Sequence, residues 1–135
     1  MKARQRARAR RRNYRVFIVE DDANLTAHLA DVLRLEGCAV VTAVDGLHAL
    51  QFLTEGFRPD VILLDMHMDG ADGWDFFSSL GQLELQVPVV VMTGDPDAAK
   101  CAEDVGAVSY LKKPFETDQF LHVLDEAVRP SSSTA

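Results

Sequence analysis

The 135-residue sequence has only two cysteines and no long apolar run, and both absences exclude classes of protein. Cys38 and Cys101 make neither a CxxC motif nor a zinc-ligand spacing, which favours a reducing compartment. No uninterrupted apolar stretch approaches the roughly 20 residues that span a membrane, and no signal peptide precedes the first cysteine. We therefore expect a soluble, cytoplasmic protein without a membrane partner.

Acidic side chains are absent from the first fifteen residues, whereas eight of the 14 basic residues lie there. From Val16 onward, six basic residues against 21 acidic ones leave a charge of −15. We expect residues 1–14 to form a disordered basic arm, 15–129 one folded domain, and 130–135 a flexible tail. The acidic body repels nucleic acid. Only the arm could bind it, and alternating Arg and Ala without aromatics is a weak signal.

Short apolar runs alternate with segments of helical periodicity along the rest of the chain. Five such pairs predict an α/β fold with a parallel sheet covered on both faces. We expect a flavodoxin-like, doubly wound, five-stranded sheet in the order 2-1-3-4-5, with five helices in a three-layer sandwich. The expected strands are Val16–Val19, Ala39–Ala43, Val61–Leu64, Val87–Met92 and Val108–Leu111. The expected helices lie around 25–33, 46–56, 74–80, 96–105 and 117–128, with Asp22 and Thr117 as caps.

Polar side chains follow four of the five predicted strands. Glu20 and Asp21 follow the first strand, Asp65 the third, Thr93 the fourth and Lys113 the fifth. The carboxyl ends of parallel strands meet at one edge of a doubly wound sheet, so these side chains should converge. Oxygen ligands without nitrogen or sulfur favour magnesium over zinc.

A nucleophilic aspartate beside a cation and a lysine can accept a phosphoryl group. In this interpretation Asp65 attacks phosphorus, Lys113 neutralises charge and the Thr93 hydroxyl bonds a phosphoryl oxygen. Each residue alone also has a structural explanation, as a helix cap, a turn residue or an exposed lysine. Helix capping gives no reason for all of them to gather, so their joint occurrence favours a site.

These motifs resemble, in order and spacing, those of the receiver domains of bacterial response regulators, over about residues 15 to 129. The resemblance implies a chemotaxis-regulator-like phosphoacceptor domain of two-component signalling, which assists its own phosphorylation and dephosphorylation without being an enzyme. It also implies Mg²⁺ as the cofactor, with the backbone carbonyl of His67 joining the three carboxylates. The matching segments are Glu20-Asp21, the loop from Asp65 to Gly73, Thr93-Gly94 and the stretch from Tyr110 to Phe115.

By the same resemblance, Lys113 rather than Lys112 is the functional lysine, and Thr93 and Tyr110 move together as a switch. The phosphoryl donor is a histidine kinase or a phosphotransfer protein, the output partner is unknown, and the protein is a monomer or a phosphorylation-dependent dimer. The sequence departs from the family at Asp69, where many members have proline. His67 and Asp95 occupy positions that the family uses to tune the lifetime of the aspartyl phosphate, although both could equally be solvated loop residues.

Three rival functions stay open. A haloacid-dehalogenase-type phosphatase also uses aspartate, threonine, lysine and magnesium, but it needs a second aspartate where His67 stands. A flavodoxin-like carrier needs phosphate-binding amides after the first strand, where Glu20 and Asp21 repel phosphate. An interaction-only receiver that works without phosphorylation could have the same residues at every position.

Overall fold

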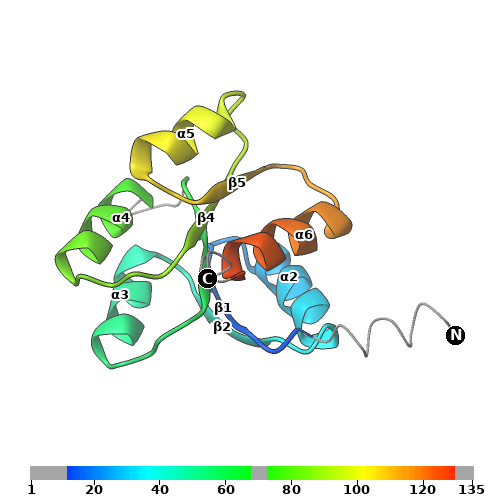
Figure 1. The fold of residues 1–135 in the computed structure, drawn as a ribbon, viewed down its shortest axis with the longest axis horizontal. Helices are drawn as coiled ribbons and strands as arrows, with labels where there is room; N and C mark the ends of the chain where they lie inside the picture. The colour runs from blue at the N-terminus through cyan, green and yellow to red at the C-terminus, as the bar shows by residue number, and fades with distance from the viewer. Residues whose placement is uncertain (1–11, 68–72, 130–135) are drawn as a thin grey trace, which may run out of the picture.

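The computed structural model describes residues 12–67 and 73–129, and a parallel five-stranded sheet forms its centre (Figure 1). The strand order is β2-β1-β3-β4-β5, which confirms the predicted flavodoxin-like topology. The second strand has the predicted limits, and the other four differ from theirs by one or two residues at one or both ends. The fourth strand, for example, starts after Pro88, which has no N–H to donate. The strands are β1 (Arg15–Val19), β2 (Ala39–Ala43), β3 (Val61–Asp65), β4 (Val89–Thr93) and β5 (Ser109–Lys112).

Five helices connect the strands and complete three layers, as predicted. Helices α2 and α6 cover one face of the sheet, and α3, α4 and α5 cover the other (Figure 1). Within the described ranges, no helix is long and apolar enough to cross a bilayer. The helices are α2 (Ala23–Leu35), α3 (Gly46–Thr54), α4 (Gly73–Gln82), α5 (Ala98–Val105) and α6 (Thr117–Val128).

Both faces of the sheet are buried at its central strands β1, β3 and β4, which explains why these strands are almost continuously apolar. In β1, Phe17 packs toward α3 and α4, and Ile18 packs toward α2 and α6. Neither side chain has any exposed surface. Each fully buried side chain of this size contributes about 1.5–3 kcal/mol relative to an exposed one. The sheet is therefore a stable base for the loops at its edges.

Helix caps show where the sequence interpretation succeeded and where it did not. Asp22 caps α2 as predicted, because its side chain accepts hydrogen bonds from the backbone of Asn24 and Leu25. The predicted cap at Thr117 is wrong. Glu116 precedes α6 in an extended conformation, and its carbonyl accepts the first helical hydrogen bond, so Thr117 is the first residue inside the helix.

The segment before β1 is held against the ends of α2 and α6. Arg12 donates two hydrogen bonds of 2.8 Å to the carboxylate of Asp125 and also pairs with Glu36. The hydroxyl of Tyr14 donates to Asp125 at 2.6 Å. We name these four residues the clasp. Its contacts place Arg12 and Tyr14 against the domain rather than in a free arm, while 1–11 and 130–135 lie outside the described residues.

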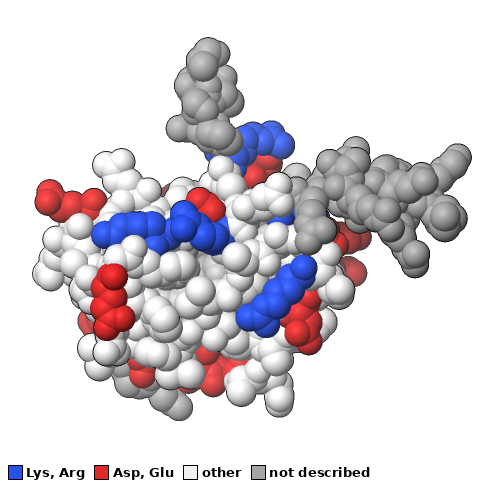
Figure 2. Space-filling view, turned by 90° about the horizontal axis from the view of Figure 1, so that it is seen from below, with Lys and Arg blue, Asp and Glu red and all other residues white. Residues whose placement is uncertain are grey.

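The contacts of the clasp shift the pKa values of Tyr14 and Asp125. Burial and the hydrogen bond to Asp125 raise the pKa of Tyr14, so its hydroxyl stays protonated. Burial opposes ionisation of Asp125, but the hydrogen bonds from Arg12 and Tyr14 outweigh it and lower the pKa of that carboxyl. Figure 2 shows that some of the basic side chains on the face in view lie beside acidic ones, while other acidic side chains there stand apart.

Candidate functional site

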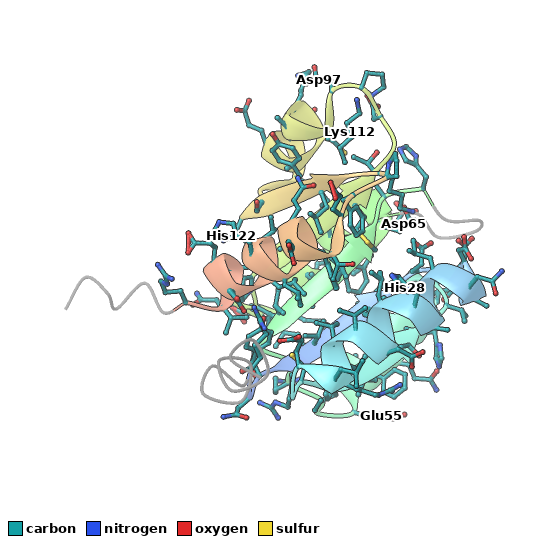
Figure 3. The ribbon with its side chains drawn as sticks, turned by 90° about the vertical axis from the view of Figure 1, so that its right-hand side faces the viewer. His28, Glu55, Asp65, Asp97, Lys112 and His122 are labelled. Atoms are coloured by element: carbon teal, nitrogen blue, oxygen red, sulfur yellow. The ribbon has the colours of Figure 1, made fainter. Side chains whose placement is uncertain are left out.

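Three carboxylates converge at the edge of the sheet where the strands end. Glu20 follows β1, Asp21 comes next, and Asp65 is the last residue of β3. One oxygen from each lies within 4.8 Å of the others. Glu20 and Asp65 are buried, whereas Asp21 is exposed and open to solvent. Figure 3 shows Asp65 at this edge, far from the C-terminal end of α6.

Lys113 brings a positive charge to the cluster. Its Nζ lies 2.9 Å from Glu20 Oε1 and 3.4 Å from Asp65 Oδ1. The backbone fixes this position, because the Lys113 amide donates to the carbonyl of Thr93 at 2.8 Å. Lys112 is exposed on β5 instead. The geometry therefore brings Lys113, the lysine that the sequence interpretation selected, into contact with the carboxylates.

One lysine does not balance the negative charge of the cluster. Burial, together with the hydrogen bond to Asp65, raises the pKa of Glu20 to about 7, even though Lys113 opposes the shift. Burial also opposes ionisation of Lys113, but Glu20 and Asp65 raise the pKa of its ammonium group. The pocket thus holds more negative charge than it neutralises. The three carboxylates offer oxygen atoms as metal ligands, which fits a hard divalent cation such as Mg²⁺.

Thr93 lies beside this cluster at the end of β4 and is completely buried. Its hydroxyl accepts a hydrogen bond of 3.0 Å from the amide of Asp95, and it contacts His67 Nε2 at 3.1 Å. The His67 amide in turn donates to Asp65 Oδ1 at 3.1 Å. His67 therefore links the residue at the end of β3 to the hydroxyl at the end of β4.

Sequence reasoning missed the contact between His67 and Thr93. The available signal was positional, because His67 lies two residues beyond the end of β3 and Thr93 ends the neighbouring strand. Tyr110 lies on β5 with 42 % of its surface exposed, so its side chain is at the surface of the domain. A Cβ added at Gly94 would meet no atom within 4 Å, which leaves space beside Thr93. Asp69 and the loop around it lie outside the described residues.

The fold and the acidic pocket with Lys113 are those of a receiver-type signalling domain, a class of phosphoacceptor domains. Sequence comparison agrees, because the family model of the response regulator receiver domain matches residues 16–125. The chain belongs to this family, which acts in two-component systems with histidine kinases or phosphotransfer proteins and binds Mg²⁺ in an acidic pocket.

Individual relatives support the assignment. The transcriptional regulatory protein PrrA of Mycobacterium tuberculosis is 38% identical over 123 residues, which cover 90% of this chain and 52% of PrrA. Sporulation initiation phosphotransferase F of Bacillus subtilis is 32% identical over 109 residues, covering 79% of this chain and 87% of that protein. The solved chemotaxis protein CheY4 of Vibrio cholerae has a TM-score of 0.77 at 27% identity and covers 86% of this chain and 99% of that one. The chain spans about half the length of PrrA.

Proposed function

We propose that Asp65 accepts a phosphoryl group from a histidine kinase or a phosphotransfer protein. The observation that carries this proposal is the meeting of Glu20, Asp21 and Asp65 within 4.8 Å, with the Lys113 ammonium in contact with two of them. We assign Mg²⁺ to these three carboxylates and to the backbone carbonyl of His67. A bound Mg²⁺ would supply positive charge to the phosphoryl oxygens.

The residues of the pocket have separate roles in the transfer. A carboxylate oxygen of Asp65 attacks phosphorus in line and forms a new P–O bond, while the bond from phosphorus to the donor breaks. The leaving group departs with the electron pair of that bond and takes up a proton. Lys113, whose Nζ lies 3.4 Å from Asp65 Oδ1, balances charge on the transferring oxygens. The hydroxyl of Thr93 can donate a hydrogen bond to one of them.

Phosphorylation then changes a surface that a partner reads. We propose that Thr93 and Tyr110 transmit the change to the surface formed by α5, β5 and α6. The side chain of Tyr110 is exposed on β5, and in this proposal it moves toward the domain when Thr93 shifts. The output partner is a separate protein or another part of a longer chain, and the domain acts as a monomer or as a phosphorylation-dependent dimer.

The decisive experiment measures the intact mass after incubation with Mg²⁺ and acetyl phosphate. We expect the wild type to gain the mass of one phosphoryl group and Asp65→Asn to gain none. Asp60→Asn is the matched control, because it makes the same chemical change at the opposite edge of the sheet, where Asp60 pairs with Arg15. It should gain mass like the wild type. Omission of Mg²⁺ should abolish the gain in all samples.

The outcomes also separate the rival functions. A gain of mass by Asp65→Asn would show that a residue other than Asp65 is phosphorylated. No modification of the wild type would favour a receiver that works through protein interaction alone. Multiple turnovers of phosphate esters would favour a haloacid-dehalogenase-type phosphatase, although the position two residues after Asp65 holds His67, whose side chain contacts Thr93.

A further inference from the structure

The hydroxyl of Thr93 has two hydrogen-bonding neighbours in the described part of the chain. The amide of Asp95 lies 3.0 Å from Oγ1, and Nε2 of His67 lies 3.1 Å from it. Thr93 has no exposed surface, so water cannot replace either neighbour without a rearrangement. Among the described residues, these two therefore determine the hydrogen bonding of the Thr93 hydroxyl.

The chemistry of the groups indicates the direction of each hydrogen bond. A backbone amide can only donate, so Asp95 uses a lone pair of the hydroxyl oxygen. The single hydroxyl hydrogen then needs an acceptor, because a buried donor without a partner is costly. Nε2 of His67 can accept it when the ring hydrogen is on Nδ1. The His67 side chain is exposed, so Nδ1–H can face solvent.

We propose that His67 is a positioning residue that holds the Thr93 hydroxyl hydrogen in the unphosphorylated protein. This inference rests on the proposed function, in which the same hydroxyl donates to a phosphoryl oxygen on Asp65. One hydrogen cannot be donated to both acceptors, so phosphorylation has to break the contact with His67. The contact joins the ends of β3 and β4, and it favours the unphosphorylated arrangement of the pocket.

The first test compares initial rates of phosphorylation by acetyl phosphate and Mg²⁺, followed by intact mass. His67→Ala removes the acceptor and keeps the backbone carbonyl, so we expect the rate to rise about 3- to 10-fold, the range of one hydrogen bond. His67→Gln provides an amide oxygen that can accept the same hydrogen, and its rate should return toward that of the wild type. His28→Ala, an exposed histidine on α2, is the control and should have no effect.

A double-mutant cycle tests whether His67 acts through Thr93. Thr93→Val removes the hydroxyl, so His67→Ala should no longer change the rate in that background. The same increase in both backgrounds would overturn the proposal, because the effect would not depend on the hydroxyl. An unchanged or lower rate for His67→Ala in the wild-type background would also overturn it.

A measurement without phosphodonor keeps the inference separate from the proposed function. Nitrogen NMR of the histidine rings should show the tautomer of His67 with hydrogen on Nδ1, and Thr93→Val should shift the Nε2 signal. The tautomer with hydrogen on Nε2 would overturn the role of His67 alone. Failure of the wild type to gain a phosphoryl group would instead contradict the proposed function and, with it, the role of His67 in phosphorylation.

Discussion

At the edge of the sheet where the strands end, two buried carboxylates share one lysine, whereas at the opposite edge one arginine lies between two carboxylates. The first set is Glu20, Asp65 and Lys113, and the second is Arg12 with Glu36 and Asp125 in the clasp. The clasp adds a Tyr14 hydroxyl that donates to Asp125. Both sets therefore contain two carboxylates and one cation, yet their surroundings differ.

The pKa values of Glu20 in the acidic pocket and of Asp125 in the clasp are shifted in opposite directions. Burial and Asp65 raise the pKa of Glu20 to about 7, while the pKa of Asp125 is lowered despite burial because Arg12 and Tyr14 donate to it. A fork of guanidinium N–H groups matches a carboxylate better than a single ammonium does. Similar charged groups are therefore incompletely neutralised in the acidic pocket and fully paired in the clasp. The acidic pocket can gain from a further cation, and the clasp already has its partners.

The largest expected effect concerns the lysine of the acidic pocket. Lys113→Met should lower the rate of phosphorylation by acetyl phosphate about 10²-fold, since removing one charge-stabilising group from a site typically costs that much. Lys112→Met is the matched control, because Lys112 is the exposed neighbour, and its rate should stay near that of the wild type. Initial rates from intact mass provide the measurement. Equal losses in the two variants would remove the distinction between the lysines.

The second prediction concerns the free energy of unfolding and the opposite edge. Arg12→Met keeps an apolar stem but removes the ion pairs with Glu36 and Asp125, and Asp125 keeps only the Tyr14 hydroxyl within the clasp. We therefore expect the free energy of unfolding to fall by about 2 kcal/mol after allowance for partial exposure. Arg15→Met is the control. Its ion pair with Asp60, at 3.6 Å, is solvent-exposed. This pair should contribute no more than about 0.5 kcal/mol to the free energy of unfolding. Urea unfolding measures both, and similar small losses would show that the clasp does not anchor the chain.

Much of the fold and of the acidic pocket could be predicted because their signals are local. Each buried strand is an apolar run that is followed by a polar residue. Glu20 follows Val19, and Asp65 follows Leu64. The parallel topology then brings these ends together without further information. The roles assigned to the pocket residues rest on that convergence and on the family, and they stay predictions until phosphorylation is measured.

The clasp could not be predicted in the same way, because its members are far apart in sequence. Arg12 and Asp125 are separated by 113 positions, and Arg12 lies in a run of arginines that reads as a uniform basic segment. Only the folded structure, which brings the segment before β1 next to α6, shows which arginine has a carboxylate partner. The contact between His67 and Thr93 was missed for a related reason, since it depends on how the loop after β3 lies beside the end of β4.

A third prediction uses pH to test the sign of the pKa shift at Asp125. The pKa of Asp125 is lower in the folded protein than in the unfolded chain. Its ionised form therefore stabilises the fold at pH values above the unfolded pKa, which is about 3.9. That contribution is lost as the pH falls through the folded pKa. At neutral pH the free energy of unfolding of the wild type should therefore exceed that of Asp125→Asn by about 1 kcal/mol, after discounting for exposure. Urea unfolding across the acid range should show the difference shrinking, whereas a difference that grows on acidification would contradict the assigned sign.

The smallest expected effect follows from deletion of the basic segment, and it separates stability from chemistry. Removal of residues 1–11 leaves every clasp member in place, so the free energy of unfolding should change by less than about 0.5 kcal/mol. Removal of residues 1–13 also takes Arg12 and should cost as much as Arg12→Met. Neither deletion should change the rate of phosphorylation of Asp65 more than about 2-fold. The clasp lies at the other edge of the sheet, and changes at distant sites usually act independently. Urea unfolding and initial rates on the same samples test both statements. A slower rate after removal of 1–11 would show that the basic segment acts on the acidic pocket, and the two edges could then no longer be treated as independent.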